Sequence, residues 1–295
     1  MIKFNKKKFT GDNLLKRGLI LEGGAMRGLF SSGVMDVLME NRIEFDGTIG
    51  VSAGAAFGCN FKSKQPGRVI RYNTAYAKDP RFCSIRSFIK TGNMFGADFC
   101  YYEIPDKLDL FDKETFGKNP MDFYVVATDI ITGKAVYRNC EKINRDTMEW
   151  IRASASMPLA SRIVEVGGYK LLDGGISDSI PIKFFESIGY DKNLLILTQP
   201  KDYQKSANNM MPLIKLRLGK YKGLIEAMEK RHIVYNDTLK YINEKEERKE
   251  VFVIRPEEAL PIGHIEHNAD NMRRVYEIGR SIALKHIEEI KKFLS

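Results

Sequence analysis

The sequence has none of the features that mark a chain for a membrane span, for export or for metal binding. None of its apolar runs approaches the roughly 20 residues that cross a bilayer, and the basic start is not followed by the apolar run of a signal peptide. The cysteines form no CxxC pair and show no metal-like spacing to histidine; they are Cys59, Cys83, Cys100 and Cys140. We therefore expect reduced, buried thiols, a cytoplasmic location, no metal and no cofactor.

The chain also lacks internal repeats, low-complexity blocks and linkers rich in proline or serine. Its 295 residues, 43% of them hydrophobic, alternate short apolar runs with segments of helical periodicity. Strands are predicted at 18–21, 45–51, 122–129, 135–138, 162–166, 169–172, 193–198 and 251–255, and helices at 26–41, 145–154, 221–248 and 268–293, with another opening at Ser52. This alternation predicts an α/β fold with helices on both faces of a layered sheet. Residues 62–120 are less regular, and we expect them to form a cap or lid over one edge of the sheet.

Acidic residues are scarcer than basic ones. The 47 Lys and Arg residues outnumber the 38 Asp and Glu residues and leave a net charge of +9, which favours anionic partners. Basic residues concentrate at 3–8, where Phe4 and Phe9 lie nearby, and at 215–231. This interleaving suits lipid headgroups and predicts peripheral contact with an anionic membrane, the alternative being a solvated face. No recognised nucleic-acid-binding motif is present, so we expect no nucleic acid partner.

The strongest chemical motif is the turn GVSAG, which places Ser52 between Gly50 and Gly54. A nucleophilic serine projects from a sharp strand-to-helix turn, which requires small neighbours, and the dipole of the following helix stabilises negative charge there. Here a hydrophobic strand precedes the motif and an alanine-rich helix follows it. We therefore predict that Ser52 is a nucleophile; the alternative is a tight turn with a capping serine.

A second loop between a strand and a helix contains Gly23, Gly24, Ala25, Arg27 and Gly28. Such a loop presents backbone N–H groups that suit an anion, either a phosphate or the oxyanion of a tetrahedral acyl intermediate. A nucleotide site is poorly supported, because there is no GxxxxGK[ST] and Ala25 breaks the GxGxxG spacing. Since the loop lies shortly before Ser52 in the chain, it is a natural oxyanion hole.

An apolar strand ends at Asp173, which Gly174 and Gly175 follow. A carboxylate there can accept the proton of a serine or orient a base, although Asp-Gly is also a common turn. A histidine base in the Ser–Asp–His order of α/β-hydrolases is formally available. Against it, the loop and the serine turn lie on the first two strands, and every histidine lies in a charged or loop-like segment. We expect surface or structural roles for His232, His264, His267 and His286.

The order of a GGxxRG loop, GxSxG and DGG resembles the patatin-like phospholipases, most closely their bacterial cytosolic branch, over residues 18–200. The resemblance implies a three-layer α/β/α sandwich with a mainly parallel central sheet, and a Ser–Asp dyad in place of a triad. Ser52 matches the nucleophile, Asp173 the proton acceptor, and Gly24 and Ala25 the amides of the oxyanion hole. Supporting positions of the three motifs are Gly23, Arg27, Gly28, Gly50, Gly54, Gly174 and Gly175.

Two positions depart from that family pattern. Ala25 stands where the family normally has glycine; alanine donates its N–H equally well if φ is negative, whereas a positive φ would distort the hole and lower activity. The segment SIP at 179–181 stands where family members usually have Asn-Pro. That change affects the loop behind Asp173 and not the dyad itself.

We predict a basic N-terminal segment at 1–17, a catalytic domain at 18–200, and a helical C-terminal region with one strand at 201–295, packed on the catalytic domain. The predicted function is a serine acyl hydrolase that cleaves lipid esters (phospholipid, lysophospholipid or acylglycerol) through an acyl-enzyme. Two alternatives stay open: an α/β-hydrolase-type esterase with a histidine base, and a non-catalytic protein that binds anionic lipid surfaces.

Overall fold

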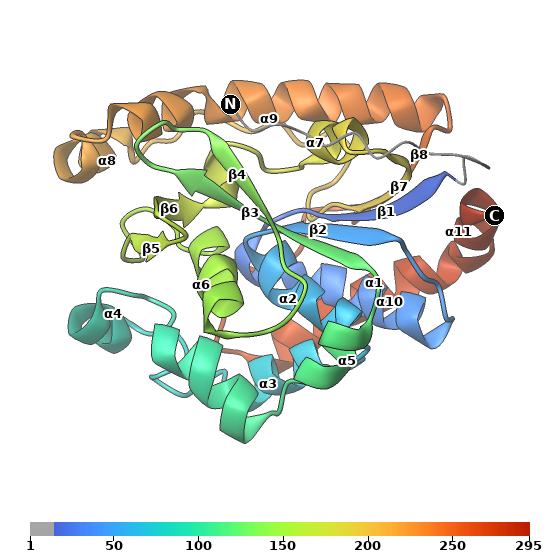
Figure 1. Ribbon diagram of the computed structural model, residues 1–295, viewed down its shortest axis with the longest axis horizontal. Coiled ribbons are helices and arrows are strands. Elements are labelled where there is room, and N and C mark those ends of the chain that lie inside the picture. Colours follow the sequence, from blue (N-terminus) through green and yellow to red (C-terminus); the bar gives the residue numbers. More distant parts are fainter. Residues whose placement is uncertain (1–14) are drawn as a thin grey trace.

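A central sheet organises the computed structural model, which describes residues 15–295; the basic cluster at 3–8 and most of the predicted segment 1–17 lie outside the described residues. The sheet of the described part has eight strands in the order β5-β6-β3-β2-β1-β7-β8, with β4 paired to β3 (Figure 1). The strands are β1 (Lys16–Leu21), β2 (Gly47–Val51), β3 (Asp122–Asp129), β4 (Ala135–Asn139), β5 (Val164–Val166), β6 (Tyr169–Asp173), β7 (Tyr190–Ile196) and β8 (Val251–Ile254). Strands β3, β2, β1, β7 and β8 run parallel, whereas β4, β5 and β6 pair in the antiparallel sense.

Helices cover both faces of this sheet (Figure 1). On one face lie α1 (Gly28–Glu40), α2 (Ala53–Lys62) and α10 (Ala269–Lys285), and on the other lie α7 (Ile182–Ser187) and α9 (Lys222–Glu247). Strand β1 is apolar over residues 18–21 because both of its faces are covered there: Leu19 and Leu21 pack on the α1 side, and Ile20 packs on the α9 side. The predicted three-layer α/β/α fold with a mainly parallel central sheet is therefore confirmed.

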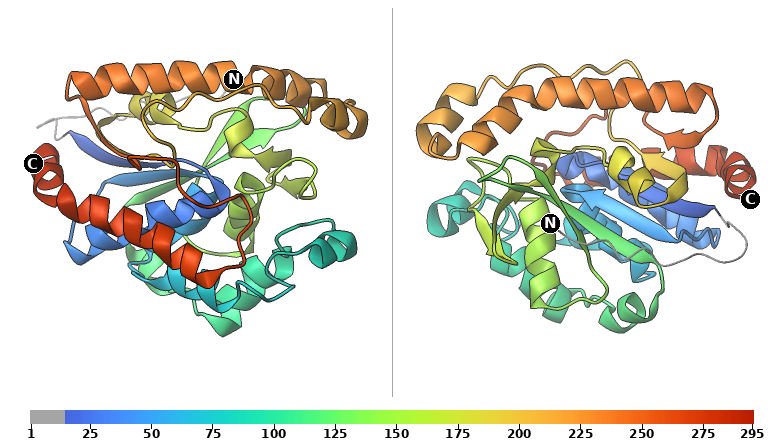
Figure 2. Two further views of the ribbon diagram at one scale, coloured as in Figure 1. Left: turned by 180° about the vertical axis from the view of Figure 1, so that it is seen from behind. Right: turned by 45° about the horizontal axis from the view of Figure 1, so that its top comes forward.

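The C-terminal third contributes to the same layers. Strand β8 extends the sheet beyond β7, and α10 crosses α1 closely (Figure 2). A Cβ atom on Gly33 would lie 2.1 Å from the carbonyl oxygen of Tyr276, so only glycine permits this approach. The prediction of one helix over 268–293 is wrong, because the helix breaks at His286 and α11 (Ile287–Leu294) follows. The break lets Phe293 pack against Phe252 of β8, with ring centroids 5.8 Å apart.

Short helices fill residues 62–120, on the side of α2 that faces away from the sheet (Figure 1). They are α3 (Arg68–Ala75), α4 (Ile85–Thr91), a π-helical segment (Phe99–Leu108) and α5 (Lys113–Lys118). The aromatic residues that made this stretch irregular in the sequence form a small core of their own. That core includes Phe82, Phe99 and Ile104, with Tyr72 and Phe95 packed against it.

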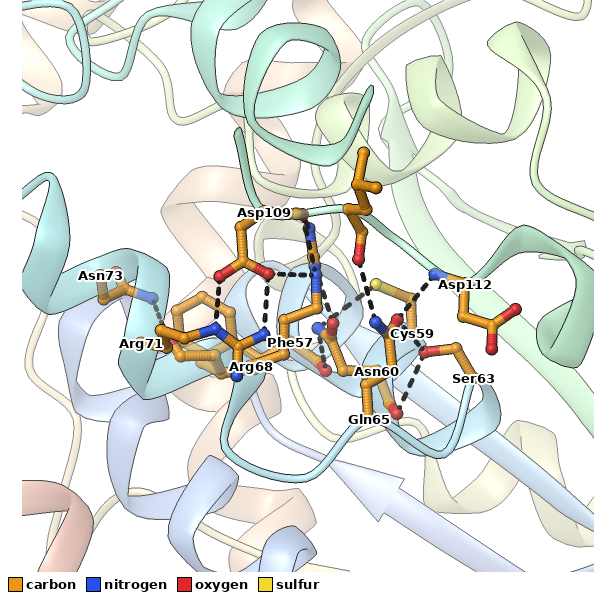
Figure 3. Close-up of polar contacts among 12 residues, drawn as sticks. Phe57, Cys59, Asn60, Ser63, Gln65, Arg68, Arg71, Asn73, Asp109 and Asp112 are labelled. Carbon is orange, nitrogen blue, oxygen red and sulfur yellow. Dashed lines mark hydrogen bonds and ion pairs between the residues drawn. The ribbon is translucent and has the colours of Figure 1, made fainter. Parts of the chain in front are cut away.

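A buried ion-pair network joins this region to α2 (Figure 3). Arg68, whose side chain is 4% exposed, lies 3.2 Å from Asp109 Oδ1 and donates a 2.8 Å hydrogen bond to Asn60 Oδ1 on α2. Arg71 donates two further hydrogen bonds to the same carboxylate, of 2.7 and 2.8 Å. Asp109 follows the π-helical segment directly, so the network fixes the end of that segment to α2 and α3.

The remaining elements are α6 (Arg145–Ser154), which matches its predicted bounds, and α8 (Met211–Leu218). No helix in the described part of the chain combines the length and the apolar character that a membrane crossing requires. Among residues 15–295, no three His, Cys, Asp or Glu side chains come together as ligands of a metal ion would. The four cysteines are free thiols, and three of them are buried.

Candidate active site

Ser52 occupies a strained turn between β2 and α2. Its backbone has φ 56° and ψ −120°, a conformation that residues other than glycine rarely adopt. The flanking glycines are required by close contacts, because a Cβ on Gly50 or on Gly54 would lie 2.4 Å from a backbone oxygen. The Ser52 amide donates a 2.8 Å hydrogen bond to Ser154 Oγ of α6, which fixes the turn. The turn therefore has the strand–turn–helix form predicted from GVSAG.

The glycine-rich loop that follows β1 lies directly against this turn. A Cβ on Gly23 would come within 2.9 Å of Ser52 Cβ, and one on Gly28 within 2.8 Å of Ala53 Cβ. A short 3₁₀ turn, Ala25–Arg27, leads from the loop into α1. Loop and turn thus meet at Ser52, as an oxyanion hole requires.

Ala25 has φ 49°, in the left-handed region. This is the case in which we expect a distorted oxyanion hole, since alanine at such a φ is strained by its Cβ. The same φ gives a physical reason for glycine at this position.

Register across the sheet brings Asp173 beside Ser52. Val51, at the end of β2, pairs with Val126 of β3, and the next residue of β3, Ala127, pairs with Asp173. Asp173 is only 5% exposed. Its carboxyl lies close enough to the Ser52 hydroxyl for that hydroxyl to lower its pKa, and it accepts a 2.7 Å hydrogen bond from the Gly175 N–H. Serine and aspartate from separate motifs therefore lie side by side.

The electrostatic surroundings of Asp173 act in opposite directions. Burial raises the pKa of its carboxyl above the ordinary value, because the charged form loses hydration. The Ser52 hydroxyl, the charge of Arg231 and the Gly175 N–H lower the pKa again, in that order of size. The group is thus a buried carboxyl whose charged form is held by three neighbours.

Two cavities of different character meet at Ser52. The first, of about 120 Å³, is lined mainly by apolar side chains, including Phe57, Phe82, Phe95 and Met157. The second, of about 400 Å³, is more polar and contains Asp173 together with cationic side chains. Its charged and titratable lining residues are Glu22, Arg27, Asp173, Lys205, Arg231, Tyr235 and His264.

Glu22, the residue directly before Gly23, anchors the glycine-rich loop through hydrogen bonds to its carboxylate. Its carboxylate accepts hydrogen bonds from the Thr198 N–H (2.6 Å), the Thr198 hydroxyl (3.1 Å) and the Tyr235 hydroxyl (2.6 Å). The residue is 2% exposed, so these three donors replace the water it has lost. The sequence showed Glu22 as part of the loop but gave no sign of partners that lie far along the chain.

The histidines differ in their positions. His264 lines the polar cavity, and burial together with the charges of Arg27, Lys205 and Arg231 lowers the pKa of its imidazole. His267 contacts the Ala77 carbonyl oxygen and His286 contacts Glu289, both away from Ser52. Within residues 15–295, no hydrogen bond joins a histidine to Ser52 or to Asp173. Sequence reasoning missed the place of His264, because nothing in the loop PIGHIEH signals it.

Comparison with known proteins matches two parts of the chain to family models. A model described as "Patatin-like phospholipase" matches residues 19–185, and one described as "Domain of unknown function (DUF6363)" matches residues 221–295. The uncharacterized protein YjjU of Escherichia coli is 26% identical over 94% of this chain and 78% of its own length. Lysophospholipase nte1 of Emericella nidulans is 28% identical over 59% of this chain and 11% of its own length. Among solved structures, VipD from Legionella pneumophila superimposes with a TM-score of 0.46 at 11% identity, over 93% of this chain and 67% of that one.

Proposed function

Because this chain belongs to the patatin-like phospholipase family, we propose that it cleaves carboxylic esters of lipids through a Ser52–Asp173 dyad. The family indicates a lipid acyl hydrolase in general terms; the dyad and the ester are our proposal. The observation that carries it is that Ser52 and the buried Asp173 carboxyl lie side by side at the junction of an apolar and a polar cavity. The apolar cavity suits an acyl chain, and the polar one suits the alcohol part of an ester.

The proposed reaction depends on the transfer of one proton between Ser52, Asp173 and the substrate. Asp173 takes the proton of Ser52 Oγ as the oxygen attacks the ester carbonyl carbon, and the N–H groups of Gly24 and Ala25 hold the oxyanion. When the intermediate collapses, the C–O bond to the alcohol breaks and Asp173 returns the proton to the leaving oxygen. Water, deprotonated by the same carboxylate, then attacks the acyl-enzyme; the bond between the acyl carbon and Ser52 Oγ breaks, Asp173 returns the proton to Oγ, and the acid is released.

Labelling by a fluorophosphonate probe tests the nucleophile. We expect wild-type protein to be labelled, Ser52→Ala to be unlabelled, and Asp173→Asn to be labelled far more slowly, because the serine has lost its proton acceptor. Ser187→Ala and Asp202→Asn, which change exposed residues of the same types, serve as matched controls and keep the label. Persistent labelling of Ser52→Ala at the wild-type rate would disprove the assignment.

A histidine base is the second candidate, and the location of His264 in the Ser52 cavity is the observation that favours it. His264→Gln separates the two mechanisms. The dyad predicts that ester hydrolysis and labelling continue in this variant, and Asp173→Asn remains the more severe change. If His264→Gln abolishes labelling while the fold is kept, the base is the histidine.

We further propose that the protein contacts anionic membranes through a face made by α4 and α8, here called the α4–α8 face. Both helices line one surface cavity through Phe88, Ile89, Arg217 and Leu218, and they lie at the same end of the molecule (Figures 1 and 2). Phe88 and Ile214 of these helices also line the cavity that holds Ser52. The α4–α8 face is therefore continuous with the mouth of the candidate site.

Composition of the α4–α8 face suits a lipid surface. Ile85, Ile89 and Leu216 are 69%, 79% and 83% exposed, and basic residues alternate with them: Arg86, Lys90, Lys215 and Arg217. Exposed apolar side chains insert among lipids, while basic ones attract anionic headgroups. The cytoplasmic location expected from the sequence stays a prediction beside this one.

Vesicle co-sedimentation tests the α4–α8 face. We expect the protein to bind vesicles of phosphatidylglycerol and phosphatidylcholine more than vesicles of phosphatidylcholine alone. The triple variant Ile85→Ser, Ile89→Ser, Leu216→Ser should lose most of that binding. Leu284→Ser, which changes a side chain of α10 that is 51% exposed, is the control and should bind as the wild type does. Equal binding by the triple variant would rule out this face.

A further inference from the structure

Three cations project into the polar cavity beside Ser52 without a carboxylate partner. Arg27 comes from the glycine-rich loop, Lys205 from the segment after β7, and Arg231 from α9. None of the three forms an ion pair with any residue of the described range 15–295. Their position differs from that of the basic residues on the molecular surface, many of which are paired with a nearby carboxylate.

Uncharged groups hold two of these cations, Arg231 and Lys205, in place. Arg231 Nε donates a hydrogen bond to the Gly175 carbonyl oxygen, two residues after Asp173. The backbone of Lys205 is fixed by two hydrogen bonds with the Asn236 side chain, and its Nζ lies 4.3 Å from the centre of the Tyr235 ring. Arg27 Nε is buried and has no hydrogen-bond partner among residues 15–295. Arg231 and Lys205 are thus positioned by groups that do not neutralise their charge, and Arg27 has a buried N–H without a partner among residues 15–295.

The carboxylates of the same cavity are already engaged. Glu22 accepts hydrogen bonds from Thr198 and Tyr235, and Asp173 accepts one from Gly175 and lies beside the Ser52 hydroxyl. Arg27, Lys205 and Arg231 also repel one another. Burial and then the charge of Arg231 lower the pKa of the Lys205 ammonium to about 8; the charge of Glu22 opposes this shift, and that of Arg27 adds a smaller lowering. Like charges gathered in a partly buried space are costly unless an anion joins them.

We propose that Arg27, Lys205 and Arg231 form a subsite for a phosphate-type anion, so that the preferred substrates are acyl esters of phosphorylated alcohols. This inference rests on the proposed function and narrows its substrate class. The acyl chain lies in the apolar cavity, the ester lies at Ser52, and the phosphate lies among the three cations. Arg and Lys both bind phosphate oxygens well, Arg by its fork of N–H groups and Lys as a point charge.

Placement of the subsite gives the C-terminal third a part in recognition. Arg231 and His264 belong to residues 201–295. So does Tyr235, whose ring lies against the Lys205 ammonium. Both Arg27 and Ser52 come from the matched patatin-like part. Substrate choice is therefore shared between the two parts of the chain, whereas the bond-breaking pair lies in one of them.

A pair of substrates that differ only in the phosphate tests the subsite. Oleoyl lysophosphatidic acid and monoolein carry the same acyl ester of glycerol and can be dispersed in the same non-ionic detergent. We expect wild-type protein to show a kcat/KM at least roughly tenfold higher for the phosphorylated ester. Lys205→Met and Arg231→Gln should each lower that ratio about tenfold, mainly through KM. Lys201→Met and Lys240→Gln, which change exposed cations nearby in the chain, should keep the wild-type ratio.

Dependence on pH supplies a readout that a merely structural lysine would not affect. With a pKa of about 8, Lys205 loses its charge as pH rises through that value, so the preference for the phosphorylated ester should fall there. The same fall should be absent in Lys205→Met. The charged and titratable groups that face Lys205 are Arg27, Arg231, Glu22, His264, Tyr203 and Tyr235.

Inorganic phosphate distinguishes a headgroup from a free ion. If the subsite takes the headgroup, phosphate competes with lysophosphatidic acid and the ratio is high. If phosphate alters monoolein hydrolysis while the ratio stays near one, the three cations bind the free ion, and the proposed preference for phosphorylated esters is overturned. A ratio near one with no effect of phosphate overturns the proposal. Failure of the proposed function looks different, because neither ester is then cleaved and no fluorophosphonate label appears.

Discussion

Ala25 has a strained backbone conformation and also supplies an N–H to the proposed oxyanion hole. Its left-handed φ of 49° costs about 1 kcal/mol relative to glycine, whereas glycine loses a similar amount through its freer unfolded chain. Ala25→Gly should therefore leave the free energy of unfolding within about 1 kcal/mol of the wild type. It should raise kcat for monoolein several-fold, because the oxyanion donor can relax. Urea denaturation and steady-state kinetics measure both quantities.

Lys249→Gly is the matched control for that substitution. Lys249 also has a positive φ, of 58°, but it lies at the end of α9 and outside both cavities. The control should change stability by a comparable amount and leave kcat unaltered. A kcat for Ala25→Gly equal to or below that of the wild type would show that the alanine does not disturb the hole.

Asp173 predicts the acid limb of the pH profile. Under the proposed mechanism the carboxylate is the active form, and burial raises its pKa above 3.8 while Ser52, Arg231 and Gly175 lower it again. Activity on monoolein should thus rise with pH as the proton leaves, with a midpoint above 3.8. Removing the charge of Arg231 removes one lowering influence, so Arg231→Gln should move the limb to higher pH. Lys240→Gln should not move it, and an unmoved limb in Arg231→Gln would contradict the stated coupling.

The residues of the candidate site were predictable where a motif carried them. Ser52, Asp173 and the glycine-rich loop stand in short patterns whose chemistry is local, and the structure brings these three motifs together. Lys205, Arg231 and His264 have no such pattern, because each is an ordinary residue of a helix or loop. Only the order of the strands and the course of α9 bring them to the cavity, and no short window of sequence contains that information.

Among the elements, α2, α3 and the π-helical segment depend on one carboxylate. Asp109 pairs with the buried Arg68 and with Arg71 (Figure 3). Asp109→Asn removes that charge and leaves Arg68 buried without its counterion, which should lower the free energy of unfolding by about 3 kcal/mol. Urea denaturation measures the loss. Asp106→Asn breaks an exposed pair with Lys113 and should cost less than about 1 kcal/mol; equal losses in the two variants would refute the special role of the network.

Element boundaries followed the sequence where the pattern is local. The strand at 122–129 and the helix at 145–154 have the bounds predicted for them, since an apolar run or a capped helical period defines each. The break at His286 was missed, because the apolar spacing continues through it. The break accompanies the packing of Phe293 on Phe252, a tertiary contact that periodicity does not show.

At the scale of the whole molecule, we propose that the C-terminal third folds as one unit with the rest; the division at 18–200 and 201–295 stays a prediction. One core cluster contains Leu19 and Phe30 together with Met272 and Val275. Thermal unfolding should therefore give a single transition, with tertiary and secondary signals lost together. Two separate transitions in a calorimetric scan would contradict this. The variant Asp109→Asn should shift the single transition without splitting it.

The layering of the whole molecule was predictable, but the strand order was not. Alternating strands and helices predict covered sheet faces. The pairing of β1 with β7 and of β7 with β8 joins segments far apart in the chain, and several orders satisfy the same alternation. This strand order places α9 over Ser52. The residues that line the polar cavity therefore depend on the strand order, which the sequence pattern did not predict.

The meeting of two cavities at Ser52 also has a consequence in time. Under the proposed mechanism the alcohol half of the ester departs from the polar cavity first, and the water for the second step arrives through the space it vacates. The fatty acid, seated among Phe57, Phe82 and Phe95, leaves last. Release of the fatty acid would then limit turnover. Accumulated free fatty acid would inhibit the enzyme by binding again in the apolar cavity.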